Sequence, residues 1–383
     1  LPPPPLSHAL LPCTTVSRPP GREAGNITTD MLTSGTPVGL VSYKADLSDT
    51  EILRLNPEMI AFLDHHVDKG IGAYSKLRRL LQLIIDDSNF NLVYDDKTRT
   101  AAETFRDRRG NCLSFTNMFI AMARHLGLSA EFQEVQIPPN WSMDGHSFVL
   151  SRHINVYIEL EHEVNQVVDF NIDDFKSSYE MERISDERAH AHYFNNIGVE
   201  HMLADKNAEA MGYFRRAIKS DPGFSPTWVN MGILYRREGL PVYAEASYLQ
   251  AIRVDSKNMV AISNLANLYE RQGDYSLAEG YRKRVDRHRM RNPYYRYKLA
   301  REAFDAAHYE DAIDHLKVAV RQQKNVDSFY FLLGLSYFKF GDEQAGQRWL
   351  AKAMETVETG SLKRAYNHKL ELLLSSADGG ASH

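Results

Sequence analysis

The chain has 383 residues, which is more than one hydrophobic core usually accommodates, so two or more domains are expected. Its hydrophobic content of 43%, charged content of 25% and net charge of -5 are those of an ordinary globular protein and argue against a general nucleic-acid binder. No apolar run approaches the roughly 18 residues of a membrane span. Two cysteines are too few for a disulfide framework or a cysteine zinc site.

Residues 1–45 form a proline-rich leader that is expected to be a disordered tether. The leader has no charged segment followed by an apolar stretch, as a signal peptide would. The run LLPC, which ends at Cys13, loosely resembles a lipidation site, with proline in place of the usual small residue. A lipid anchor upstream and a place in the cell envelope are the expectation, and a cytoplasmic location is the alternative.

Residues 46–185 predict a first domain in which helices precede strands. The helix at 48–67 would begin with a capping box of Ser48 and Glu51, and the helix at 111–127 would be capped by Asn111 and ended by Gly127. The other expected helices are 74–87 and 101–110. Runs rich in Val, Ile, Phe and Tyr predict antiparallel strands at 130–137, 147–160 and 166–172. The order of these elements indicates an α+β fold.

The remainder of the chain repeats with a period of 34 residues. A small residue recurs at this spacing: Gly198, Gly232, Ala266, Ala300 and Gly334. Large aromatic residues recur around each of these positions. Small residues let two antiparallel helices approach closely, while the aromatics fill the space to the next pair. The pattern resembles the tetratricopeptide (TPR) repeat. We expect five repeats at 191–224, 225–258, 259–292, 293–326 and 327–360, within a solenoid at 190–360, and a capping helix at 361–376.

A TPR solenoid presents a concave groove, and the resemblance implies a protein or peptide partner there. Arg237, Arg271 and Lys339 share one repeat position, although Asp305 breaks the series. A basic stripe of this kind would suit an acidic peptide or a C-terminal carboxylate. The alternative is an ordinary solvated helix face.

Cys112, in the run RRGNCLSF, stands at the expected start of a helix. The helix macrodipole and the free backbone N–H groups there stabilise a thiolate, and Arg108 and Arg109 would add to the effect if they point toward the sulfur. Papain-type chemistry also needs an imidazole to take the proton and a carboxylate to orient the imidazole.

His146 and His153 both qualify as the base. If the last two strands form a hairpin, Asp169 faces Val156 or Tyr157, which places His153 near Asp169 and His146 on the order of 23 Å further along the strand. His153 is therefore the favoured base and Asp169 the orienting carboxylate. A bulge in the strand would bring His146 closer, so His146 stays an alternative.

A helix beginning RRGNC, a strand beginning HINVYI and an aspartate at the end of QVVDFN resemble the bacterial transglutaminase-like superfamily over residues 70–180. The resemblance implies a papain-like fold with Cys112 as nucleophile, His153 as base and Asp169 as orienter. Asn155 and Phe170 depart from the usual pattern, in which an aromatic and a proline are common at these places. With TPR repeats and a proline-rich leader, the architecture is similar to that of bacterial envelope lipoproteins.

Two hypotheses follow. In the first, the chain is a cysteine acyl-transfer enzyme, either a peptidase or amidase or a transglutaminase, with TPR repeats that recruit a protein or peptide. The oxyanion hole would use the backbone N–H of Cys112 and a second donor, for which Tyr94 is a candidate. In the second, the first domain is degenerate and the chain is a non-catalytic TPR scaffold. Neither hypothesis requires a cofactor, a metal ion or nucleic acid.

Overall fold

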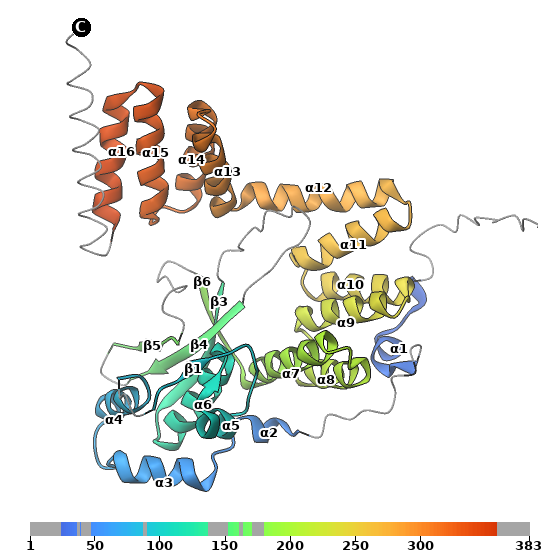
Figure 1. Cartoon of the computed structure of the whole chain (residues 1–383), viewed down its shortest axis with the longest axis vertical. Helices are drawn as coiled ribbons and strands as arrows, with labels where there is room; N and C mark the ends of the chain where they lie inside the picture. Colours follow the sequence, from blue (N-terminus) through green and yellow to red (C-terminus); the bar gives the residue numbers. More distant parts are fainter. Residues whose placement is uncertain are drawn as a thin grey trace, which may run out of the picture.

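The structure is a computed structural model that describes residues 24–36, 39, 47–86, 90–136, 152–160, 164–170 and 180–357. These residues form an α+β domain (residues 47–184) and a helical array (residues 186–356) (Figure 1). Three sequence predictions fall outside the described residues: the alternative base His146, the LLPC run and the capping helix at 361–376.

The helices of the α+β domain precede its main sheet, as predicted. They are α2 (Asp49–Ile52), α3 (Pro57–His66), α4 (Ala73–Leu81), η3 (Gln82–Asp86), α5 (Ala101–Asp107) and α6 (Cys112–His125). The prediction of a single helix at 48–67 is wrong, because residues 53–56 are not helical and separate α2 from α3. Pro57 disfavours helical backbone at Asn56, which instead caps α3 by accepting a hydrogen bond from the Met59 N–H.

The main sheet has the order β5-β4-β3-β6, and each pair of neighbours is antiparallel. Its strands are β3 (Ser129–Gln136), β4 (Arg152–Glu159), β5 (Gln166–Val168) and β6 (Glu180–Ile184). The sequence reasoning missed β6, whose run EMERI carries no apolar alternation. A parallel pair, β1 (Val93–Tyr94) and β2 (Arg109–Gly110), leads directly into α6.

Helix α6 is the centre of the α+β domain. The residues from Leu113 to Ala123 are all buried, so the helix is enclosed on every side and not on one face alone. The hydroxyl of Thr116 donates to the backbone oxygen of Ile154 at 3.1 Å and joins α6 to β4. This contact fixes the first turn of α6 against the strand that carries His153.

The helical array consists of five helix pairs. They are α7 (Asp186–Leu203) with α8 (Asn207–Ser220), α9 (Ser225–Arg237) with α10 (Pro241–Val254), α11 (Met259–Arg271) with α12 (Tyr275–Arg291), α13 (Pro293–Asp305) with α14 (Tyr309–Gln322), and α15 (Asp327–Phe340) with α16 (Glu343–Thr356). The recurring small residue lies where the two helices of a pair touch. A Cβ atom on Gly232 would lie 2.4 Å from the Tyr248 ring, and one on Gly334 would lie 2.7 Å from the Leu350 side chain.

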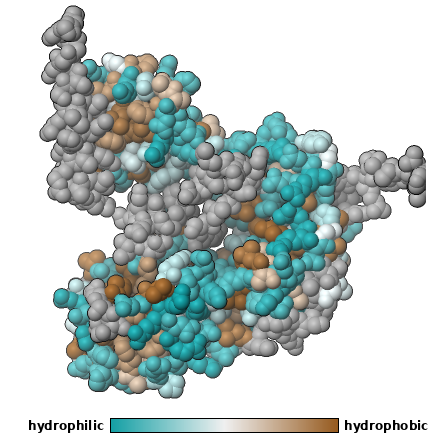
Figure 2. Space-filling view, in the orientation of Figure 1, coloured by the Kyte–Doolittle hydropathy of each residue, from teal (hydrophilic) through white to brown (hydrophobic). Residues whose placement is uncertain are grey.

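The first helix pair belongs to both regions. Tyr193 and Phe194 of α7 lie in the same hydrophobic core as the buried face of α6. Arg124 of α6 pairs with Asp186 at 2.6 Å, and Arg216 of α8 pairs with Asp49 at 2.9 Å. In Figure 1 the array leaves the domain at α7 and α8, rises through α9–α11, and brings α13–α16 above the sheet. In Figure 2 hydrophobic patches show between the array and the domain and also on the helices at the top of the picture, and the rest of the coloured surface is mostly hydrophilic.

Part of the predicted tether is ordered. Residues 24–36 form η1 (Ala24–Asn26) and α1 (Thr29–Ser34), and they pack against α10. Leu32 is buried in the core of the array, and its backbone oxygen accepts a hydrogen bond from the Tyr235 hydroxyl. The expectation of a disordered leader over 1–45 is therefore wrong for this segment, because the aliphatic side chain of Leu32 fills a gap in the array.

Within the described part of the chain, no helix combines the length and the apolar character that crossing a bilayer requires.

Candidate active site

Cys112 is the first residue of α6 and is partly exposed. Asn111 caps the helix as predicted, since its side chain accepts a hydrogen bond from the Ser114 N–H at 3.0 Å. A Cβ atom at position 110 would lie 2.5 Å from the Ser114 Cβ, so this tight approach requires glycine. The GNC run therefore holds the sulfur at the positive end of a buried helix.

The two arginines before Cys112 contact other groups. The Arg108 guanidinium lies over the Phe90 ring at 5.3 Å. Arg109 pairs with Asp95 at 3.5 Å and is 56% exposed. These contacts are with Phe90 and Asp95 and not with the sulfur, so they do not support the suggestion that the two arginines stabilise the thiolate.

His153 lies at the start of β4 and joins the cysteine to a carboxylate. Its Nε2 lies 2.7 Å from Oδ1 and 2.8 Å from Oδ2 of Asp169, and both side chains are buried. The thiol of Cys112 is a further hydrogen-bond partner of the ring. Because Asp169 occupies Nε2, Nδ1 is the nitrogen left for the sulfur. The structure therefore brings Cys112, His153 and Asp169 together in that order.

The strand register differs by one residue from the expected one. Val156 pairs with Val168, so Asp169 comes one residue beyond that pair and lies across from Asn155, not from Val156 or Tyr157. His153 and Asn155 share a face of β4 because side chains alternate along a strand. Nδ2 of Asn155 accordingly donates to Oδ2 of Asp169 at 3.0 Å. Asn155 is thus a polar support for Asp169 that the sequence did not reveal.

The surroundings of His153 favour its charged form. Burial lowers the pKa of this imidazole, but the hydrogen bonds with Asp169 and Cys112 and the charges of both partners outweigh burial. Together they raise the pKa from 6.5 to about 9. At neutral pH the site therefore holds an imidazolium between a carboxylate and the sulfur.

Comparison with known proteins adds to this geometry. The model of the transglutaminase-like superfamily matches residues 64–170, which include the cysteine, the histidine and the aspartate. A tetratricopeptide repeat model matches residues 261–291.

The chain carries a transglutaminase-like domain followed by TPR repeats.

The α+β domain is called the transglutaminase-like domain from here on, and the helical array is called the TPR array. The predicted fold class, an α+β domain followed by a TPR solenoid, is confirmed.

One curated relative is subunit 3 of the anaphase-promoting complex of Schizosaccharomyces pombe. It is 25% identical to this chain over 140 residues, which are 36% of this chain, and the chain spans about a fifth (21%) of its length. Similar solved structures include the MamA protein, with 19% identity, a TM-score of 0.25, and coverage of 44% of this chain and 91% of that one. Another is YrrB, a TPR protein with an unusual peptide-binding site, with 14% identity, a TM-score of 0.24, and coverage of 46% and 92%.

A cavity of about 450 Å³ opens beside Cys112, between the transglutaminase-like domain and the TPR array. The domain contributes Cys112, Leu113 and Ile154 to its lining. Most of the lining comes from the first helices of the first three TPR pairs and the residues that precede them: His192, Asn195, Asn196, Val199, Phe224, Pro226, Val229, Asn230, Ile233, Asn258 and Val260. The concave side of the TPR array therefore forms one wall of the space above the sulfur.

His192 is a lining residue that the sequence reasoning missed. Its Nε2 lies 2.6 Å from Oε1 of Glu134 on β3, both side chains are largely buried, and its ring packs against Phe224 at 4.3 Å. The pair joins the sheet to α7 and thereby fixes this wall of the cavity. Nothing in the sequence links these two residues, which are 58 positions apart.

The residues of the expected basic stripe do not line this cavity. Arg237, Arg271 and Lys339 stand at the C-terminal ends of α9, α11 and α15. Arg237 donates to the backbone oxygen of Met202 at 2.8 Å and pairs with Asp205, so it binds the preceding turn of the array. The proposed peptide-binding role of these three residues stays a prediction.

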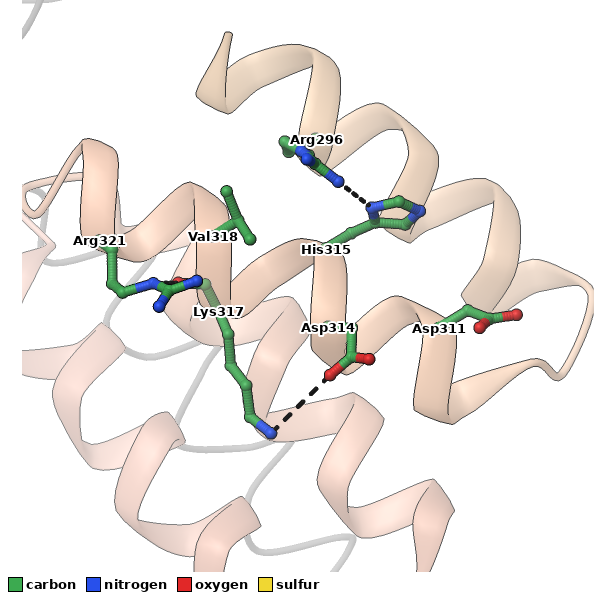
Figure 3. Close-up of a pocket in the computed structure, with 7 residues that line it drawn as sticks. All are labelled: Arg296, Asp311, Asp314, His315, Lys317, Val318 and Arg321. Atoms are coloured by element: carbon green, nitrogen blue, oxygen red, sulfur yellow. Dashed lines mark hydrogen bonds and ion pairs between the residues drawn. The ribbon is translucent and has the colours of Figure 1, made fainter. Parts of the chain in front are cut away.

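A second hollow, of about 400 Å³, lies on α13 and α14 (Figure 3). Two side-chain contacts lie within it: Arg296 with His315 at 3.1 Å, and Lys317 with Asp314 at 4.0 Å. It includes no member of the Cys112 site, and no cysteine, serine or threonine lines it among the described residues.

Proposed function

We propose that this protein is a cysteine acyl-transfer enzyme in which Cys112 is the nucleophile, His153 the acid and base, and Asp169 the orienting carboxylate. One observation carries the proposal: the buried His153 ring has Asp169 on one nitrogen and the sulfur at a helix start as its other partner. This is the arrangement that activates a thiol.

The reaction would begin with the Cys112 proton on Nδ1 of His153. The thiolate attacks the carbonyl carbon of an amide, and an S–C bond forms as the carbonyl π electrons move to oxygen. The backbone N–H groups of Cys112 and Leu113, the first two residues of α6, have no partner inside the helix, so they can donate to that oxyanion. Collapse of this intermediate breaks the C–N bond, and His153 gives its proton to the departing amine.

The resulting thioester would then react with water or with an amine. Water would return the acid and make the enzyme a peptidase or amidase, whereas an amine would give a new amide. We propose hydrolysis as the main outcome, because Cys112 is partly exposed and water can reach the acyl group. The product ratio in the presence of an ordinary primary amine would separate the two, since a transamidating enzyme forms mainly the new amide and a hydrolase forms mainly the acid.

The TPR array would hold the protein or peptide on which the enzyme acts. The alternative function is a non-catalytic scaffold, and the matched TPR repeat favours an interaction role in either case. The two proposals differ in what they expect of the Cys112 sulfur.

The test is the pH–rate profile for alkylation of Cys112 by iodoacetamide, read by peptide mapping with Cys13 as an internal reference thiol. We expect fast alkylation below pH 7 that is lost in His153→Ala and retained in His146→Ala. An ordinary thiol that titrates near 8.5 and is unchanged by either substitution would exclude the enzyme and leave the scaffold.

A further inference from the structure

The cavity beside Cys112 has a distinctive chemistry on its TPR side. Val199, Val229, Ile233 and Val260 present aliphatic side chains from three consecutive first helices, and Phe224 and Pro226 extend this surface. No Lys, Arg, Asp or Glu lines the cavity among the described residues. The one imidazole in its lining, that of His192, is engaged with Glu134.

The cavity also adjoins the reacting atoms. Cys112 is part of its lining, and so is Leu113, the next residue in the first turn of α6. A carbonyl carbon in contact with the sulfur would therefore place its neighbouring side chain against the TPR wall. The volume of about 450 Å³ is within the usual range for a ligand pocket and accommodates a peptide residue.

We infer that the TPR array forms the acyl-donor pocket of the enzyme and selects an uncharged aliphatic side chain next to the scissile carbonyl. The inference rests on the proposed function and adds a substrate class to it. Apolar burial makes an aliphatic donor favourable. A carboxylate or an ammonium group would lose water here without gaining an opposite charge.

Polar groups in the lining suit a peptide donor. Nδ2 of Asn230 donates to Oδ1 of Asn195 at 2.9 Å, which ties α9 to α7 and orients both amides. Asn196 adds another side-chain amide to the same wall. Amide groups can both donate to and accept from a peptide backbone, so they would position the donor without adding charge.

The inference is tested with dipeptidyl acyloxymethyl ketones on the full chain. In these probes the sulfur displaces a carboxylate, forms a thioether and labels Cys112 for intact-mass detection. The residue beside the ketone is Leu, Glu or Lys. Each labelling rate is divided by the iodoacetamide rate of the same protein, so that changes in the sulfur itself cancel. We expect the Leu probe to react roughly tenfold to a hundredfold faster than the Glu and Lys probes.

Ile233→Gln and Val199→Gln place a neutral polar group in the TPR wall and should reduce the Leu preference by about tenfold. The matched control is Leu335→Gln, which alters the same repeat position as Ile233 three repeats later and outside the cavity lining, and it should keep the preference. Thermal unfolding checks that each variant is folded.

The outcomes separate the two proposals. Slow alkylation of Cys112 by iodoacetamide would contradict the proposed function itself. Fast alkylation with equal normalised rates for the three probes, or a Leu preference that survives both cavity substitutions, would overturn only the pocket.

Discussion

The transglutaminase-like domain and the TPR array bury different kinds of side chain. Between residues 98 and 155 the domain buries many polar groups, among them Asn111, Ser114, Asn117, His153 and Asn155. The array mostly buries small residues against large apolar ones, such as Gly232 against Tyr248. Several buried polar groups of the array, namely His192, Asn195 and Asn258, line the cavity beside Cys112.

This difference indicates which side-chain contacts define the structure of each region. Several polar groups of the domain hold one another in place, as Asn111 does Ser114 and as Asn155 and His153 do Asp169. In the array, a small residue of one helix packs against a large side chain of its partner helix, as Gly232 does against Tyr248. This packing rule does not involve the groups around Cys112. Substitutions among the polar groups around Cys112 should therefore lower the rate more than the stability, and substitutions where the two helices of a TPR pair touch should lower the stability more than the rate.

The largest effect is expected for Asp169→Asn. The change preserves the shape of the site but removes the charge that orients His153, so the rate at which the Leu probe alkylates Cys112 at neutral pH should fall by about 10³ to 10⁴. Asp314→Asn removes a carboxylate from the exposed surface of α14 and should leave the rate unchanged. The measurement is pre-steady-state labelling by the Leu probe. A loss of less than tenfold in Asp169→Asn would contradict the view that the polar groups of the domain serve the rate.

A smaller effect concerns the charge of His153. The folded pKa of about 9 lies above the usual 6.5, so the pair with Asp169 stabilises the fold fully below pH 6.5, and this contribution is lost as the pH rises through 9. The Cys112→Ser background removes thiol titration and the sulfur's share of the shift. There the loss should be at most about 3 kcal/mol relative to Cys112→Ser with His153→Gln.

Urea unfolding at several pH values measures this loss, and NMR titration of the His153 ring gives its pKa directly. Parallel stability curves for the two proteins would contradict the assigned charge.

The smallest effects come from a matched pair of glycines in the array. Gly334→Ala should destabilise the protein by about 1–3 kcal/mol, because its Cβ would lie 2.7 Å from Leu350 and 3.0 Å from the Gly346 oxygen. Gly280→Ala, on α12 with nothing within 4 Å, should stabilise it by about 0.5–1 kcal/mol. Urea unfolding measures both, and the alkylation rate of Cys112 should stay the same. Equal signs for the two changes would refute the packing rule.

Local signals predicted much of the fold. The capping residues Ser48 and Asn111 were recognisable because a cap is a contact between near neighbours in the chain. The 34-residue period predicted the helix pairs, since each repeat satisfies its own packing. His153 and Asp169 could be proposed because they are only 16 positions apart, on two strand-like runs that follow each other in the sequence.

The remaining features depend on contacts between distant segments. The register that sets Asp169 across from Asn155 follows from the packing of a whole sheet, which no single strand encodes. The His192–Glu134 pair and the TPR wall of the cavity exist only because α7 packs on β3. The burial of Leu32 against the array could likewise not be predicted from the sequence of a proline-rich leader.

The packing of residues 24–36 on α10 gives the transglutaminase-like domain two attachments to the same scaffold. The chain touches the array before the domain begins, at α1, and enters the array again at α7 when the domain ends. In chain order, the domain lies between a short segment that packs on α10 and the first helix of the array. Contacts on both sides of the domain restrict its movement relative to the array, so we expect the TPR wall to stay at a fixed distance from the Cys112 sulfur.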